Sequence, residues 1–498
     1  MTGRPAAPDD RTRHWLAERA WLPGVGVLAD VLIEAAGDRF TAITPDTPAA
    51  SAPAGTTRLP GLTMPGLANA HSHAFHRALR GITHRAGPAG HGTFWTWRER
   101  MYQVADRLDP DSYLALARAV FAEMTLAGIS CVGEFHYLHH GPGGQRYADP
   151  NAMGAALLEA AAEAGLRITL LDTCYLTGGL DRAGGALPLA GPQTRFGDGT
   201  GQAWAERVGL LGGDAHGQVG PAARVGAAIH SVRAVPPDQM AEVIAWSHRH
   251  GAPLHAHLSE QVAENEACLA AYGGTPAEVL YRAGALGPRT TAVHATHLTN
   301  ADIRLLAESE TFACACPTTE ADLADGIGPF AALAAAGCRL TVGSDSQAVV
   351  DLLEETRRIE MYQRLATGRR GHFGAEALGT AVTWDGHASL GWPDAGEIAP
   401  GALADLVTIG LDSPRLAGAV DAAVLAGQSG VPGADPAGSD LPEFGPDLAV
   451  LAAVLFTATA ADVRNVVVGG RDVVAEGRHL LVGDVPAALG AAIRAVLG

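Results

Sequence analysis

The 498-residue sequence contains no lysine, so all 35 of its basic residues other than histidine are arginines. A chain without lysine cannot form a Schiff base through a side chain or build a Walker-type phosphate loop. It also cannot supply a carbamylated lysine to bridge two metal ions. Enzyme classes that depend on these groups are therefore excluded.

The chain also has few cysteines, few charged residues and no long hydrophobic run. Six cysteines in so long a chain do not resemble the disulfide framework of a small secreted protein. The net charge of -18 makes nucleic acids and anionic membranes poor partners. The longest apolar run, residues 448–456, is too short to span a bilayer, and the first residues lack the apolar core of a signal peptide. We expect a cytoplasmic protein that binds neither nucleic acid nor membrane.

Eight strand-like apolar segments alternate with amphipathic helical stretches between residues 61 and 395. The segments are residues 62–73, 129–137, 167–175, 224–232, 252–260, 291–298, 311–317 and 339–346. Eight such units predict a (β/α)₈ TIM-type barrel, which belongs to the α/β class.

The two ends of the chain differ from this central region. Residues 1–60 and 396–498 contain short strand-like segments separated by glycine turns. We expect both ends to build one small β-sandwich domain beside the barrel. The glycine- and proline-rich residues 426–447 predict a flexible surface insertion.

Histidines follow the apolar end of the first predicted strand, at His71, His73 and His76. Residues two apart on a strand point to the same side, so His71 and His73 either share a metal ion or are two surface histidines. The carboxyl ends of barrel strands meet on one face, which brings in His257 and Asp345. Three nitrogens and one carboxylate suit Zn²⁺, so we predict one Zn²⁺ per chain. Asp345 read alone could instead cap the following helix.

Two further polar residues lie at the same predicted strand ends. Glu260 is three residues after His257 and is predicted to pass a proton to a leaving nitrogen. His294 ends the sixth strand and is predicted to polarise a water molecule together with Asp345. We therefore interpret Glu260, His294 and Asp345 as the catalytic residues.

The pattern HxH, HxxE, H and D on strands one, five, six and eight resembles the mononuclear zinc deaminase branch of the amidohydrolase superfamily. The segments "FWTWRERMYQVADRL", "GEFHYLHH" and "AIHSVRAVP" further resemble the formimidoylglutamate deiminases, over nearly the whole chain. This resemblance implies hydrolysis of N-formimino-L-glutamate to N-formyl-L-glutamate and ammonia in histidine degradation.

The same resemblance implies a set of residues that bind this dicarboxylate. Arg98 and Arg233 match positions that hold its carboxylates, and the planar arginine fork suits this task. Further substrate contacts are implied at His76, Tyr137 and His230. Several relatives carry glutamine where this chain has His76. We place Arg98 in a binding loop, although a surface salt bridge with Glu99 is the alternative for that residue alone.

Two other readings stay open at this point. A relative from the same branch could act on an aromatic ring such as guanine or cytosine, which predicts an apolar pocket without two arginines. A barrel that has lost its activity would bind no metal. The choice between zinc and iron is also open, and for the assembly we expect a homodimer.

Overall fold

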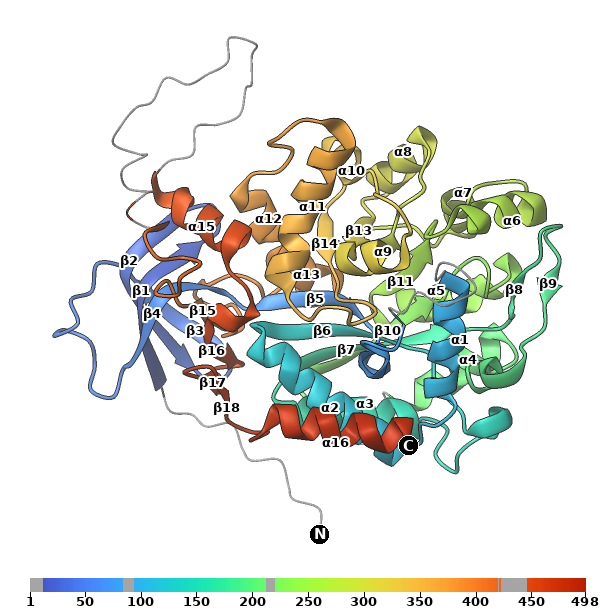
Figure 1. Ribbon diagram of the computed structural model, residues 1–498, viewed down its shortest axis with the longest axis horizontal. Coiled ribbons are helices and arrows are strands. Elements are labelled where there is room, and N and C mark those ends of the chain that lie inside the picture. The colour runs from blue at the N-terminus through green and yellow to red at the C-terminus, as the bar shows by residue number, and fades with distance from the viewer. Residues whose placement is uncertain (1–11, 84–93, 212–219, 420, 422–445) are drawn as a thin grey trace.

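The computed structural model describes residues 12–83, 94–211, 220–419, 421 and 446–498. Eight parallel strands form a sheet that curls into a barrel with helices around it (Figure 1). The strands are β5 (Leu67–Ser72), β6 (Ile129–His136), β7 (Arg167–Cys174), β10 (Ala223–Ile229), β11 (Leu254–Leu258), β12 (Thr290–His294), β13 (Phe312–Ala315) and β14 (Leu340–Val342). The predicted barrel is confirmed.

The first and last strands of the barrel meet at a short junction. A bridge joins Ser72 to Asp345, whose backbone N–H donates to the carbonyl of His71 at 3.0 Å. Gly343 makes this approach possible, because a Cβ there would lie 2.7 Å from the Cβ of His71. The junction therefore brings two predicted metal ligands side by side.

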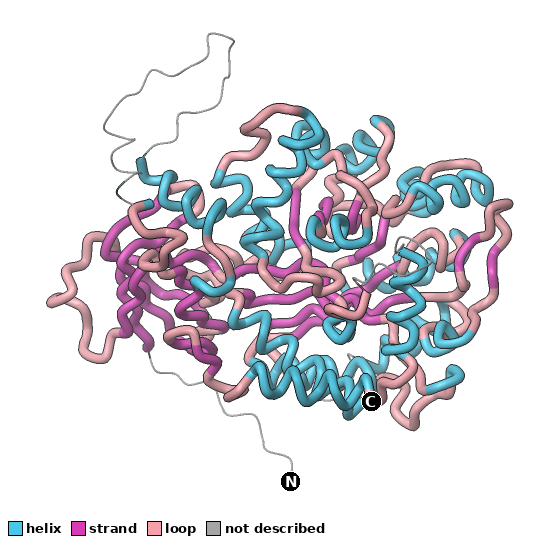
Figure 2. The backbone as a smooth tube through the Cα atoms, viewed as in Figure 1, coloured by secondary structure: helices cyan, strands magenta, loops and turns pink. Residues whose placement is uncertain are grey.

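Helices cover the outside of the barrel, where Figure 2 shows them around the central strands. The helices are α1 (Phe94–Ala105), α2 (Pro110–Leu126), α3 (Ala152–Ala164), α4 (Gly201–Leu211), α5 (Pro237–His250), α6 (Val262–Tyr272), α7 (Pro276–Ala283), α8 (Asn300–Glu308), α9 (Pro317–Leu323), α10 (Phe330–Ala335), α11 (Leu352–Thr367), α12 (Ala375–Val382) and α13 (Trp384–Ser389). Local sequence signals set the ends of these helices. Asp109 caps the helix α2 by accepting a hydrogen bond from the Ser112 N–H, and Gly251 ends the helix α5 in the left-handed conformation.

A second eight-stranded sheet combines both ends of the chain, with strand order β18-β17-β16-β15-β4-β1-β2-β3. Its strands are β1 (Thr12–Leu22), β2 (Gly26–Ala36), β3 (Arg39–Thr44), β4 (Thr57–Pro65), β15 (Leu406–Ile409), β16 (Val463–Val468), β17 (Arg471–Ala475) and β18 (Arg478–His479). Antiparallel pairing of β4 with β15 joins the two ends. The sheet has its own core, which includes Trp15, Phe40 and Val467. The predicted β domain from both termini is confirmed.

The predicted strand at residues 62–73 is in fact two strands in different sheets. β4 belongs to the terminal sheet and β5 to the barrel, with Gly66 between them. A Cβ at Gly66 would lie 2.2 Å from the Ser130 Oγ, so this crossing needs glycine. The break cannot be recognised in the sequence, because the residues on both sides of it are buried and mostly apolar. The domain limits 1–60, 61–395 and 396–498 stay predictions.

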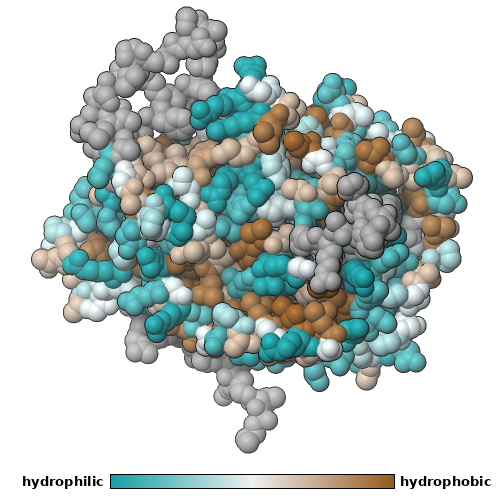
Figure 3. Space-filling model, viewed as in Figure 1, coloured by the Kyte–Doolittle hydropathy of each residue, from teal (hydrophilic) through white to brown (hydrophobic). Residues whose placement is uncertain are grey.

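The C-terminal region contains helices as well as the strands expected there. They are α15 (Pro446–Thr457) and α16 (Val485–Leu497). Helix α16 packs against α2 outside the barrel, and Figure 3 shows apolar residues gathered on this face of the molecule. The predicted insertion at 426–447 lies outside the described residues except for its last two. Within the described residues, no helix combines the length and apolar character needed to cross a bilayer.

Candidate active site

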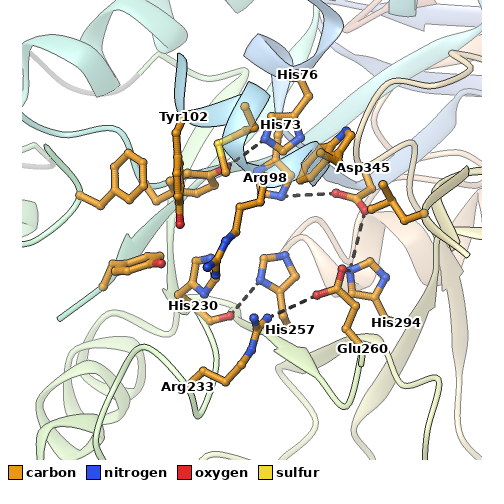
Figure 4. A pocket seen from close by; sticks show the side chains of 16 residues that line it. His73, His76, Arg98, Tyr102, His230, Arg233, His257, Glu260, His294 and Asp345 are labelled. Carbon is orange, nitrogen blue, oxygen red and sulfur yellow. Dashed lines mark hydrogen bonds and ion pairs between the residues drawn. The ribbon is translucent and has the colours of Figure 1, made fainter. Parts of the chain in front are cut away.

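Four side chains lie at the carboxyl ends of β5, β11 and β14. Figure 4 shows three of them, His73, His257 and Asp345. The Nε2 of His257 lies 3.2 Å from the Nε2 of His71. The Oδ1 of Asp345 lies 3.4 Å from the Nε2 of both His71 and His73. Ligands placed tetrahedrally around zinc at 2.0–2.1 Å are about 3.4 Å apart. These three spacings match that value, and His71 links two groups of donor atoms, one with His73 and Asp345 and one with His257 and His294.

Backbone carbonyls fix the orientation of two of these imidazoles. The Nδ1 of His73 lies 2.9 Å from the carbonyl of Phe135, and the Nδ1 of His257 lies 2.9 Å from that of His230. A carbonyl can only accept, so each Nδ1 carries the proton and each Nε2 presents a lone pair. Burial holds the pKa of both histidines well below the usual value, which keeps them neutral. The Nε2 lone pair of His73 faces the Asp345 carboxylate, and that of His257 faces the Nε2 of His71. A cation between these atoms would remove the repulsion.

The Asp345 carboxylate is ionised despite its burial. Burial alone would raise its pKa, but the hydrogen bond and charge of His71, followed by the charge of His294, hold it well below its ordinary range. The backbone at Asp345 and His294 is left-handed, with φ of 41° and 69°. Such positions cost about 1–3 kcal/mol each in non-glycine residues and persist where the surrounding structure imposes them. One residue of the donor cluster and one residue beside it are therefore strained.

The predicted acid–base residues lie beside this cluster. The Nε2 of His294 is 3.8 Å from both the Oε1 of Glu260 and the Oδ2 of Asp345. Its Nδ1 is 3.6 Å from the Oε1 of Glu320, on α9. Burial would lower the pKa of His294, but these three carboxylates together raise it well above the usual value. Sequence reasoning missed Glu320, which follows the seventh strand and orients His294.

The two predicted arginines line one pocket together with His73, His257 and Asp345 of this cluster. The Nη2 of Arg233 lies 3.4 Å from the Oε2 of Glu260, and its Nε lies 3.6 Å from the buried Glu264. Arg98 is in helix α1 rather than in the expected loop, with its guanidinium 5.5 Å from the ring centre of Tyr102. The helix reaches this position because its carboxyl-terminal half packs into the core through Met101 and Val104.

The remaining predicted substrate contacts also line the pocket. Tyr137 directly follows β6, His230 directly follows β10, and His76 lies in the 3₁₀ helix η1 (Ala74–Leu79). The Nε2 of His76 is 2.9 Å from the Tyr137 hydroxyl. Burial lowers the pKa of His76 to about 3, so its ring is neutral.

Sequence reasoning missed two residues of the pocket wall and a third residue that contacts both of them. Tyr102 on α1 and Tyr175 after β7 line the pocket. Gln193, in the 3₁₀ helix η3 (Gly191–Arg195), hydrogen-bonds to both of them. Tyr175 ends a predicted strand, so the rule that placed the other residues at strand ends could have found it. No sequence pattern points to Gln193.

A second group of metal-type side chains lies under the barrel rim, at His136, His139 and Asp172. Both oxygens of Asp172 already accept from Arg207, at 2.8 and 2.9 Å, and one also accepts from Trp204. The carboxylate is therefore used by an ion pair, and this group does not match a second metal site.

The chain was compared with known proteins and structures. Residues 62–473 match the model of the amidohydrolase family. The chain belongs to this family. It is 36% identical over 473 residues to a formimidoylglutamate deiminase of Pseudomonas aeruginosa, covering 93% of this chain and 95% of the relative. An 8-oxoguanine deaminase of the same species is 33% identical over 366 residues, covering 72% and 77%.

Solved structures give the same fold. An amidohydrolase from Brucella melitensis superimposes with a TM-score of 0.83 at 31% identity, covering 98% of this chain and 100% of that one. An adenosine deaminase from Xanthomonas campestris with bound zinc gives 0.75 at 22% identity, covering 98% of each chain. The resemblance predicted from the sequence is confirmed, and the protein is a hydrolase of C–N bonds of the deaminase type.

Proposed function

We propose that the protein hydrolyses N-formimino-L-glutamate to N-formyl-L-glutamate and ammonia. The observation that carries this proposal is a single pocket lined by Glu260, by the two arginines Arg98 and Arg233, and by three members of the donor cluster, namely His73, His257 and Asp345. A dicarboxylate needs local positive charge in a protein whose net charge is -18. Identity of 36% to a formimidoylglutamate deiminase over nearly the whole chain supports the same substrate.

One Zn²⁺ per chain would be held by four residues, namely His71, His73, His257 and Asp345. The zinc described for the Xanthomonas campestris relative supports this choice of metal. Zinc supplies hydroxide at neutral pH, since it lowers the pKa of a coordinated water to about 7.

Different side chains of the pocket carry out the individual proton transfers. Water adds to the formimino carbon, the bond from this carbon to the imino nitrogen breaks, and the water oxygen becomes the formyl oxygen. Asp345, beside the protonated His294, takes a proton from the water, and Glu260 passes protons to the imino nitrogen, which leaves as ammonia. The 3.8 Å distance between His294 and Glu260 is longer than a hydrogen bond, and catalytic contacts of this kind shorten when substrate binds.

The arginines hold the two carboxylates at different ends of the substrate. Arg233 contacts Glu260, so it is assigned the α-carboxylate, which lies one carbon from the reacting amidine. Arg98, beside Tyr102, is assigned the side-chain carboxylate. Each contact is a charge-assisted hydrogen bond of the kind that arginine forms in bidentate geometry.

The alternative is deamination of a purine-type ring, which the 33% identity to an 8-oxoguanine deaminase favours. The deciding experiment measures ammonia release from N-formimino-L-glutamate, 8-oxoguanine, guanine, cytosine and N-formyl-L-glutamate. We expect N-formimino-L-glutamate to have the highest kcat/KM by several orders of magnitude. Faster turnover of any ring substrate would overturn the proposal.

Formation of N-formyl-L-glutamate would place the enzyme in histidine degradation, as the sequence resemblance implies. The cytoplasmic location and the homodimer stay predictions. Sedimentation equilibrium of the purified protein measures the second of these.

A further inference from the structure

Two tyrosine hydroxyls and one glutamine meet at the pocket wall. The Nε2 of Gln193 lies 3.0 Å from the Tyr102 hydroxyl and 3.1 Å from the Tyr175 hydroxyl. In Figure 4, Tyr102 lies with Arg98 on the side of the pocket opposite Glu260. This trio is therefore separate from the acid–base residues.

Backbone contacts fix which way the Gln193 amide points. Its Oε1 accepts from the N–H of Ala190 at 3.2 Å, and its Nε2 lies 3.2 Å from the carbonyl of Gly178, which can only accept. Both contacts are independent of the tyrosines. The amide nitrogen therefore faces the two hydroxyls. Its two hydrogens are shared among the Gly178 carbonyl and the two phenol oxygens, and Tyr102 and Tyr175 also hydrogen-bond to each other.

A phenol whose oxygen accepts from an amide keeps its own proton for another acceptor. Burial, with a smaller contribution from the neighbouring Tyr175, raises the pKa of Tyr102 well above its usual value, so this hydroxyl stays protonated. The Arg98 guanidinium lies over the Tyr102 ring. Hydroxyl donors beside a guanidinium form a site for an anion rather than for a neutral group.

We propose that Tyr102 and Tyr175 donate hydrogen bonds to the side-chain carboxylate of the substrate, and that Gln193 is the positioning residue that turns both hydroxyls toward it. This inference rests on the proposed function and names the groups that select a second carboxylate. In this arrangement Arg98 attracts the side-chain carboxylate by its positive charge, and the two hydroxyls orient that carboxylate.

The first test removes one hydroxyl at a time. Tyr102→Phe and Tyr175→Phe are assayed on N-formimino-L-glutamate and on N-formimino-L-2-aminobutyrate, which lacks the side-chain carboxylate. We expect kcat/KM for the dicarboxylate to fall about 10- to 100-fold, mainly through KM, as for one hydrogen bond to a charged group. The loss on the truncated substrate should be less than about threefold. Equal losses on both substrates would overturn the proposal.

Tyr362→Phe is the matched control, because Tyr362 lies on α11 and its hydroxyl accepts from Arg358 outside the pocket. This variant should show the parent's preference for the dicarboxylate. It also shows whether removal of a tyrosine hydroxyl alone affects folding, which circular dichroism measures for all three variants.

The second test reverses the role of the positioning residue. Gln193→Glu keeps the size of the side chain, but its carboxylate accepts both hydroxyl protons and repels the substrate carboxylate. Its KM for the dicarboxylate should rise more than that of Gln193→Leu. A purely structural role predicts the opposite order or equal losses on both substrates, and either result would exclude positioning by Gln193.

Failure of the proposed function can be told apart from failure of this inference. If the zinc-loaded parent releases no ammonia from either formimino compound, the proposed function is wrong. Calorimetric titration with N-formyl-L-glutamate and N-formyl-L-2-aminobutyrate then decides the inference alone. Tighter binding of the dicarboxylate by the parent, lost in Tyr102→Phe, supports it. A parent that binds both equally, or neither, contradicts it.

Discussion

The two sides of the pocket are built in different ways. The donor cluster comes from the ends of β5, β11 and β14, and backbone carbonyls orient His73 and His257. The opposite side comes from α1, η3 and the segment after β7, where side chains such as Tyr102 and Gln193 orient one another. Barrel strands are a common frame, whereas connecting segments vary among relatives. We infer that the first side sets the reaction and the second sets the substrate.

The largest expected effect comes from removing a member of the donor cluster. His257→Ala should lose most of its zinc and its activity on every substrate. The activity loss should exceed the roughly 10- to 100-fold cost of disturbing the groups that support metal ligands. Metal content is measured by plasma mass spectrometry and folding by circular dichroism. His248→Ala, at an exposed position on α5, is the control. Two zinc ions per parent chain would contradict the single-metal prediction.

Removal of the acid–base group should have the next largest effect. Glu260→Gln should keep its zinc but lose about 10²- to 10⁴-fold in kcat, because it can no longer carry a proton to nitrogen. Because Glu260 belongs to the side of the pocket that sets the reaction, the loss in kcat should be the same for N-formimino-L-glutamate and for its truncated analogue. The exposed Glu266→Gln should match the parent. Near-normal turnover by Glu260→Gln would show that another residue moves the proton.

Substitutions of the two pocket arginines should change different kinetic constants. Arg98→Met should cost about 1.5–3 kcal/mol in kcat/KM for the dicarboxylate, which is the value of one hydrogen bond to a charged group. Arg233→Met should also lower kcat, since Arg233 contacts Glu260 and its loss leaves Glu264 buried without this cation. Steady-state kinetics on both formimino substrates measure this, with the exposed Arg249→Met as control. Normal kinetics in both pocket variants would refute the carboxylate assignments.

The smallest expected effect is at the position where this chain departs from several relatives. His76→Gln should change kcat/KM by less than about tenfold, because a glutamine can also hydrogen-bond to Tyr137 and a neutral hydrogen bond contributes about 0.5–1.5 kcal/mol. Activity on the dicarboxylate is the measurement. A larger loss would assign His76 a direct part in the reaction.

Strand periodicity explains why the donor side was predictable. His71 and His73 are two residues apart on a strand, and His257, His294 and Asp345 each lie at or just after the end of one. A sequence pattern of apolar runs followed by polar residues is enough to place such side chains on one face. The barrel and the terminal sheet were predictable for the same reason.

The remaining features depend on contacts that no local pattern records. Gln193 reaches the pocket from a 3₁₀ helix of five residues, and its partner Tyr102 is 91 positions away. The break between β4 and β5 depends on the approach of Gly66 to Ser130. The helical position of Arg98 follows from the packing of α1 against the barrel. Each is set by tertiary packing, which overrides local propensity.

Closure of the barrel also governs when the site can exist during folding. The hydrogen bond between Asn69 and Ser344 at the junction of β5 and β14 joins residues 275 positions apart. Contacts between such distant residues form late, because the loop entropy must be overcome before they contribute. During synthesis of the chain, His71 and His73 are therefore made long before Asp345. Zinc uptake with native affinity should accordingly coincide with the last step of folding, so that the ion reports a completed barrel.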